Sequence, residues 1–137
     1  MTRPHNPGAA RSRREARERA VELAYEAEMR GVDVDQLLAG LPLPPDAFTV
    51  ELLRAAETGR DRADELIAKQ ASGWTLERMP AMDLLVMRMA VAELIHLATP
   101  TGVVLAESVE LASRYSTEES SRFVNGVLAA LARTLRP

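Results

Sequence analysis

The sequence predicts an all-α fold, a bundle of six or seven helices, and three observations support this prediction. Alanine and leucine supply 40 of the 137 residues, whereas valine and isoleucine supply 13, and small or unbranched side chains lose the least conformational freedom in a helix. Apolar residues recur with the spacing of a helix face, and no segment alternates with a period of two. Hydrophobic residues make up 47% of the chain but aromatic ones only 4%, so aliphatic side chains must build the core.

The N-terminal third divides at its glycines and prolines. Residues 1–10 hold two prolines, one glycine and no apolar periodicity, which is typical of a disordered leader. A helical pattern then covers Ser12–Arg30 and stops at Gly31. Asp33 can cap a short helix that ends at Ala39.

A proline-rich breaker over residues 40–45 precedes the middle of the chain. From Asp46 to Ala71 the apolar positions keep one helical phase across Gly59, which predicts a single long helix with a weak point at that glycine. A short turn, Thr75–Met79, follows. Pro80 suits the first position of the next helix, because a fixed φ and a missing N–H are tolerated there.

The helix expected over residues 81–98 is apolar nearly all round. Its charged residues are Asp83, Arg88 and Glu93. Three charges argue against a membrane span and favour a central helix that is covered by its neighbours.

Two further helices complete the predicted bundle. One extends over Val103–Tyr115, and the last is capped by Ser120 or Ser121 and ends at Leu135. The expected architecture is a pair of subbundles that share the central helix.

Composition and spacing argue against an enzyme, and no cofactor or metal is expected. The chain has no cysteine and only two histidines, His5 and His96, so a convergent set of zinc ligands is not visible. Its glycines are too scattered for a phosphate-binding loop. Glu107 and Glu110 share a helix face, but a solvated surface explains them at least as well as a catalytic carboxylate pair.

No apolar run has bilayer length and the N-terminus lacks a signal-type apolar core, so we expect a cytoplasmic protein without membrane contact.

The N-terminal arm is the strongest chemical signal. Residues 1–19 hold six arginines against two glutamates, a net charge of +4, while residues 20–137 carry −7; this asymmetry is typical of a protein that docks an anionic polymer at one end. The candidate RNA-binding residues are Arg11, Arg13, Arg14, Arg17 and Tyr25. Arg13 and Arg17 share a helix face, and Tyr25 falls on nearly the azimuth of Arg14, where it could stack on a base. The alternative is an arm that only increases solubility, with Tyr25 half-buried by packing.

A second unusual segment is Phe123-Val124-Asn125-Gly126-Val127-Leu128. Glycine inside a helix costs ~1 kcal/mol relative to alanine, and asparagine is also unfavourable there. Such a violation indicates either close helix packing at Gly126, with Asn125 bonded to a neighbouring carbonyl, or contact with a partner. We favour packing, and Phe123 is expected to point inward.

Three stretches carry a family resemblance. They are Glu107-Ser108-Val109-Glu110-Leu111-Ala112 with Ser120 and Phe123-Val124-Asn125-Gly126-Val127-Leu128; Arg13-Arg14-Glu15-Ala16-Arg17 with Tyr25; and Trp74-Thr75-Leu76-Glu77-Arg78-Met79-Pro80-Ala81-Met82-Asp83 with Arg88 and Glu93. In this spacing they resemble the NusB family of bacterial transcription antitermination factors, over nearly the whole chain except the leader and the proline-rich loop.

The resemblance implies two three-helix subdomains and a single RNA-binding domain over residues 11–137. It implies binding of boxA-type single-stranded RNA in nascent ribosomal RNA transcripts, together with the small-subunit ribosomal protein NusE, in a complex on RNA polymerase. Some members form homodimers that hide the RNA-binding face. The alternatives are a helical adaptor that binds only protein, and the non-catalytic RNA-binding domain of ribosomal RNA cytosine methyltransferases. No chain remains here for a methyl-donor domain, which favours a free-standing factor.

Three acidic residues are candidate contacts to a basic, NusE-type protein partner. They are Asp83, in a family position that also carries an acid, and Glu118 and Glu119, in the polar turn expected before the last helix. Complementary charge would speed encounter with such a partner. The alternative is that these carboxylates only stabilise helix N-termini.

Overall fold

The structure, a computed structural model, describes residues 12–137, and all regular structure in this range is helical. The elements are α1 (Arg13–Arg30), α2 (Val34–Ala39), α3 (Ala47–Thr58), α4 (Arg60–Gln70), the short 3-10 helix η1 (Leu76–Arg78), α5 (Ala81–His96), α6 (Thr101–Tyr115) and α7 (Glu118–Leu135). The predicted all-α bundle is confirmed. The expected leader and Arg11 lie outside the described residues. Among the helices of residues 12–137, none has the length and apolarity needed to cross a bilayer.

The first two helices begin and end where local chemistry predicts. The Ser12 hydroxyl accepts a hydrogen bond from the Glu15 amide at the start of α1. Gly31 closes that helix at φ +65°, a left-handed conformation that glycine adopts without steric cost. Asp33 caps α2 in a reciprocal capping box with Gln36.

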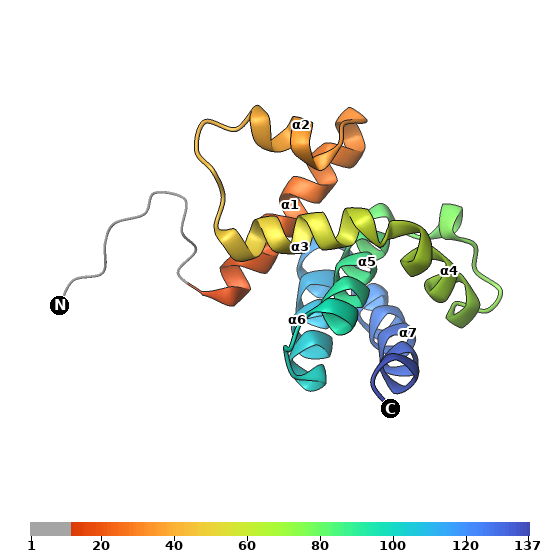
Figure 1. Cartoon of the computed structure of the whole chain (residues 1–137). Helices are drawn as coiled ribbons and strands as arrows, with labels where there is room; N and C mark the ends of the chain where they lie inside the picture. Colours follow the sequence, from red (N-terminus) through yellow and green to blue (C-terminus); the bar gives the residue numbers. More distant parts are fainter. Residues whose placement is uncertain (1–11) are drawn as a thin grey trace.

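The single helix predicted from Asp46 to Ala71 is wrong, because the chain changes direction at Gly59. The Gly59 amide donates to the Ala55 carbonyl at 3.0 Å, which completes the last turn of α3. The Gly59 carbonyl accepts from the Ala63 amide at 2.9 Å, which completes the first turn of α4. The bend lets α3 pack on α1 and α5 while α4 packs on α5 and α7, as Figure 1 shows. Since both helices contact α5, their apolar faces keep one phase across the break.

Other predicted helix boundaries are corrected by a few residues. Pro80 stands just before α5 instead of inside its first turn, and α6 begins at Thr101, before the expected Val103. The cap of α7 is Thr117, not Ser120 or Ser121: its hydroxyl accepts from the Ser120 amide at 3.2 Å. Ser120 is the second member of this capping box, which explains why it looked like the cap itself.

The central position predicted for the α5 segment is confirmed. This helix lies in the middle of Figure 1 and packs against α1, α3, α4, α6 and α7. Its buried Arg88 forms two hydrogen bonds to Asp64 of α4, at 2.7 and 2.9 Å, and its buried Glu93 pairs with Arg17 of α1. These two buried charges on the central helix are tolerated because other helices supply their partners.

One arginine ties α7 to the connection between α5 and α6. The Arg136 guanidinium donates to five acceptors: the carbonyl oxygens of Glu93, Leu94, Leu97 and Thr99 and the hydroxyl of Thr101. Carbonyls at the end of a helix have no intrahelical partner. Arg136 therefore satisfies the C-terminus of α5 and holds the start of α6 beside it.

Candidate nucleic-acid interface

The start of α1 presents a cation on an aromatic support. Arg13 is exposed, and its guanidinium carbon lies 3.9 Å from the centroid of the Phe48 ring on α3. An open hollow of about 360 Å³, lined by Ser12, Arg13, Asp46, Ala47 and Phe48, lies at this junction of two helix N-termini. The ring restricts the arginine without using its N–H donors, so Arg13 can bind an anion.

Arg14 is also exposed but is already paired. Its Nε and Nη2 donate to the Glu107 carboxylate of α6 at 3.2 and 3.0 Å. This hydrogen-bonded pair raises the pKa of Arg14, and the Coulomb attraction of Glu107 raises it further. The guanidinium thus reaches solvent while being neutralised on one side.

Arg17, predicted to bind RNA, is buried and paired inside the protein. The residue is only 6% exposed, and its guanidinium forms a two-bond ion pair with Glu93, which also accepts from the Thr99 hydroxyl at 2.9 Å. Arg13 and Arg17 do share a face, as predicted, but that face turns toward α3 and α5, where Phe48 lies 5.2 Å from the Arg17 guanidinium. Arg17 supports the aromatic platform under Arg13 instead of reaching a ligand.

Tyr25 is 41% exposed, so the packing alternative for it is not favoured. The face of α1 between Arg14 and Tyr25 is not basic, however. Glu18 pairs with Arg114 of α6, and Glu22 accepts a hydrogen bond from the Tyr115 hydroxyl at 3.1 Å. Burial raises the pKa of Tyr115, and the bond to Glu22 raises it further. A row of polar pairs, here called the α1–α6 seam, therefore joins the two helices.

Asp83 lies in an unusual environment. It is 1% exposed, and its Oδ1 has no hydrogen-bond partner in the described part of the chain. It lines a hollow of about 420 Å³ together with Trp74, Pro80, Thr117, Glu119, Ser120 and Phe123. We call this the Asp83 hollow. A buried carboxylate oxygen without a donor is costly, which makes Asp83 a candidate contact residue.

The other two predicted partner contacts, Glu118 and Glu119, are exposed in the first turn of α7, not in the turn before it. Trp74 was not singled out from the sequence as a site residue. Its ring packs edge-on against Phe123, with centroids 4.9 Å apart and planes at 86°. Trp74 is the single tryptophan of the chain and follows a glycine in a connecting segment. These two features of the sequence could have identified it as a site residue.

The same two rings separate the Asp83 hollow from a second, more open one. That hollow measures about 480 Å³ and is lined by Gln70, Ala71, Ser72, Gly73, Trp74, Arg122, Phe123, Gly126 and Val127. The expectation that Gly126 allows close helix packing is wrong, because a Cβ built there meets no atom within 4 Å. Asn125 is exposed too. The unfavourable pair faces outward, so close helix packing does not explain it.

We expect Gly126→Ala to raise the free energy of unfolding by about 0.5–1 kcal/mol, because a methyl group fits without contact and a helix-interior glycine is lost. Thermal or urea unfolding measures this. Gly31→Ala, at φ +65°, is the matched control and should destabilise the protein. A Gly126→Ala protein less stable than the wild type would restore the packing explanation.

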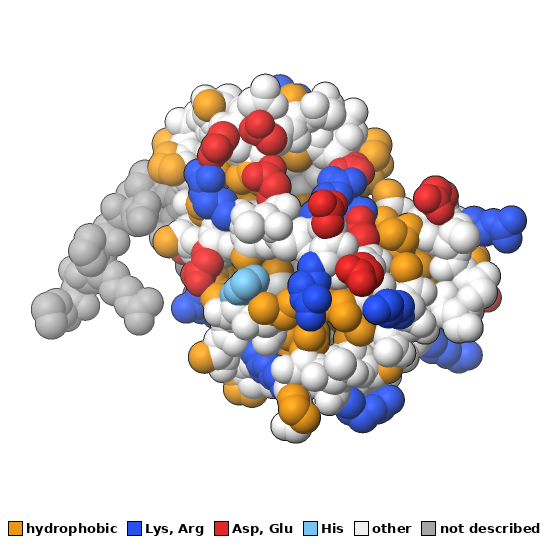
Figure 2. All heavy atoms as spheres, turned by 45° about the vertical axis from the view of Figure 1, so that its right-hand side comes forward, with side chains coloured by type: hydrophobic (Ala, Val, Ile, Leu, Met, Phe, Trp, Pro, Cys, Tyr) orange, Lys and Arg blue, Asp and Glu red, His pale blue; other side chains and the backbone are white. Residues whose placement is uncertain are grey.

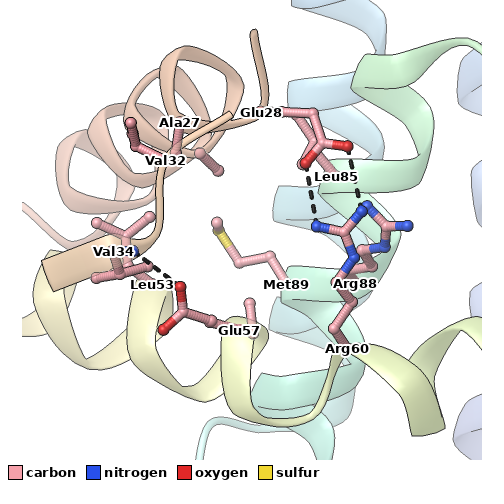
Figure 3. A pocket seen from close by; sticks show the side chains of 12 residues that line it. Ala27, Glu28, Val32, Val34, Leu53, Glu57, Arg60, Leu85, Arg88 and Met89 are labelled. Atoms are coloured by element: carbon pink, nitrogen blue, oxygen red, sulfur yellow. Dashed lines mark hydrogen bonds and ion pairs between the residues drawn. The ribbon is translucent and has the colours of Figure 1, made fainter. Parts of the chain in front are cut away.

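Figure 3 shows a third, mostly apolar pocket of about 90 Å³ between α1, α2, α3 and α5. Polar groups at its edge are already paired: Arg60 donates twice to Glu28, and Glu57 accepts from the Val34 amide at 2.8 Å. The face in Figure 2 likewise shows acidic side chains beside basic ones, not a field of one sign. Within residues 12–137 no cluster of three potential metal ligands occurs.

Comparisons with known proteins place these features in context. The model of the NusB family matches residues 14–133. Transcription antitermination protein NusB of Saccharopolyspora erythraea is 44% identical over 128 residues, covering 88% of this chain and 86% of the relative. Its counterpart in Thermobifida fusca is 45% identical over 125 residues, covering 88% of each chain.

Solved structures agree with the sequence relatives. T. maritima NusB superposes with a TM-score of 0.81 at 30% identity, covering all of this chain and 96% of the other. A chain from a crystal structure of the antitermination factors NusB and NusE in complex with double-stranded RNA reaches a TM-score of 0.75 at 27% identity, covering 89% of this chain and 96% of that one.

Proposed function

The chain belongs to the NusB family, and from this membership we propose that it is a transcription antitermination factor that binds RNA together with a NusE-type ribosomal protein. The observation that carries the proposal is the match to the family over residues 14–133, supported by the similar chain that was crystallised with NusE and RNA. The RNA is boxA-type sequence of nascent ribosomal RNA transcripts, and the assembled complex acts on RNA polymerase in the cytoplasm. Residues 11–137 form the single RNA-binding domain.

The RNA face in this proposal consists of Arg13, Arg14 and Tyr25, with Arg11 just before it in the sequence. Arg13 and Arg14 are consecutive residues at the start of α1, and both are exposed. Guanidinium groups bind phosphate through paired N–H donors, and an exposed tyrosine can stack on a base. Arg17 contributes by fixing the Phe48 platform.

The partner face consists of Asp83, Glu118, Glu119, Trp74 and Phe123. Around the Asp83 hollow it combines a buried carboxylate oxygen without a donor, the exposed carboxylate of Glu119 and two aromatic rings. The exposed carboxylate of Glu118 precedes Glu119 in the first turn of α7. A basic protein could place an arginine or lysine there, with its aliphatic stem on the rings and its charge at Asp83. A homodimer that covered the RNA face would compete with RNA and leave the partner face free.

We expect the double variant Arg13→Ala/Arg14→Ala to bind a boxA-type oligonucleotide more weakly and with a smaller dependence on salt. Each phosphate contact to single-stranded RNA contributes about 0.7 to the slope of log K against log salt, so the slope should fall by about that amount per lost contact. Fluorescence anisotropy across a salt series measures both quantities. Repeating the titration with the same oligonucleotide annealed to its complement compares the affinity for double-stranded RNA with that for single-stranded RNA.

The matched control is Arg62→Ala/Arg133→Ala, which removes two exposed arginines from α4 and α7. It changes the net charge equally and should retain nearly wild-type affinity. If Arg13→Ala/Arg14→Ala binds RNA like the wild type, these two arginines are not part of the RNA face. If the wild type itself does not bind the oligonucleotide, the RNA-binding function fails and the adaptor that binds only protein is favoured.

A further inference from the structure

We propose that Glu107 of α6 competes with RNA phosphate for the guanidinium of Arg14, so that RNA binding exchanges an internal ion pair for an external one. This inference rests on the proposed RNA-binding function and adds a residue that sets its strength. From the sequence, Glu107 is half of a possible carboxylate pair with Glu110 and part of a family motif. In the structure Glu107 instead binds the guanidinium of Arg14.

The geometry of the pair is the geometry that a phosphate needs. Glu107 accepts from Nε and Nη2 of Arg14 at 3.2 and 3.0 Å, with both carboxylate oxygens on the same edge of the guanidinium. Phosphate groups bind arginine through two parallel N–H···O bonds of this kind. The carboxylate thus occupies the edge of Arg14 that is best suited to RNA.

The two partners differ in their freedom to move. The Arg14 side chain is 58% exposed, whereas that of Glu107 is 17% exposed. Glu107 is held on α6, which packs against α5 and α7, while the guanidinium can turn outward on its flexible stem. Breaking the pair therefore means that Arg14 moves and Glu107 stays.

The helices do not depend on this one pair. Further along the α1–α6 seam, Glu18 binds Arg114 and Glu22 binds Tyr115, and these contacts remain when Arg14 leaves. Glu18 and Glu110 also act on Arg14 from a distance and raise its pKa. Three carboxylates thus surround one exposed arginine, so its attraction for phosphate is weaker than its exposure suggests.

The test is the affinity of Glu107→Gln for a boxA-type oligonucleotide at moderate salt. Glutamine keeps the size of the side chain and loses the charge. We expect an affinity increase of about twofold to fivefold, the range that corresponds to an exposed ion pair. Glu110→Gln is the matched control: it lies on the same helix and loses the same charge, but its ion-pair partner is Arg114, at 3.9 Å, and not Arg14. It should change affinity much less.

A double variant separates the specific effect from a general one. In an Arg14→Ala background, Glu107→Gln should no longer raise RNA affinity. The inference is overturned if Glu107→Gln binds RNA equally well or more weakly than the wild type, which would make Glu107 a positioning residue for Arg14. It is also overturned if Glu110→Gln gives the same increase, or if the increase persists without Arg14. Failure of the proposed function looks different, because the wild type would then not bind the oligonucleotide.

Discussion

Replacing Arg17 by alanine is expected to lower the free energy of unfolding by about 3–5 kcal/mol, the cost of breaking a buried ion pair by removing one partner. The exposed fractions of the Arg17 and Glu93 side chains are 7% and 3%, so the carboxylate would remain in the core without its cation. The Thr99 hydroxyl would be its remaining side-chain donor. Urea unfolding followed by circular dichroism measures the loss.

Two further variants show whether the effect comes from the stranded charge. Arg17→Met/Glu93→Leu removes both charges and should recover most of the stability, since apolar replacements of buried ion pairs are often neutral. Arg19→Ala, on the same helix but exposed, should change stability by less than about 0.5 kcal/mol. A loss below 1 kcal/mol for Arg17→Ala would contradict the role given to this pair.

Asp83→Asn is expected to weaken binding to a NusE-type protein by about 2–5 kcal/mol, the range for removing one member of a buried charge pair at an interface. The variant loses no hydrogen bond in the free protein, because Oδ1 has no donor in the described structure. The free energy of unfolding should therefore stay the same or rise. Trp74 lines the Asp83 hollow, and its fluorescence can follow a titration with the purified partner.

Asp61→Asn provides the control for the alternative explanation, in which Asp83 only stabilises a helix N-terminus. Asp61 lies in the first turn of α4 as Asp83 does in α5, but it is exposed and away from the Asp83 hollow. If the helix dipole is the whole reason for Asp83, both variants should lose about 0.3–1 kcal/mol of stability and keep partner affinity. That pair of results would remove Asp83 from the partner face.

Much of the fold follows from local chemistry and could be predicted. Gly31 and Asp33 stop and start helices through their own backbone and side chain, and the α5 segment is apolar on all sides, so its burial needs no knowledge of the neighbours. The bend at Gly59 could not be predicted in the same way. Both sides of that glycine contact α5, and an uninterrupted apolar phase is the expected pattern for one straight helix as well as for two that share a neighbour.

The site was less predictable because it depends on residues that are distant in the sequence. Arg13 and Arg17 are one turn apart and look equivalent in the sequence. Only Arg17 is buried, because it pairs with Glu93, which lies 76 residues further along the chain. Gly126 could be recognised as unusual from helix propensity alone. Whether it faced a helix or solvent depended on the direction of α7, which is set by packing against α4, α5 and α6.

The burial of α5 also limits how such a chain can change over evolutionary time. This helix packs against α1 and α3 from the first half of the fold and against α4, α6 and α7 from the second half. It is therefore part of the core of both halves. A recombination that replaced either half with one from an unrelated helical protein would leave α5 facing surfaces that do not match it, with overpacked or empty contacts. We therefore expect the segment from α1 to α7 to tolerate recombination only as a whole, because either half alone would leave one side of α5 without its matching surface.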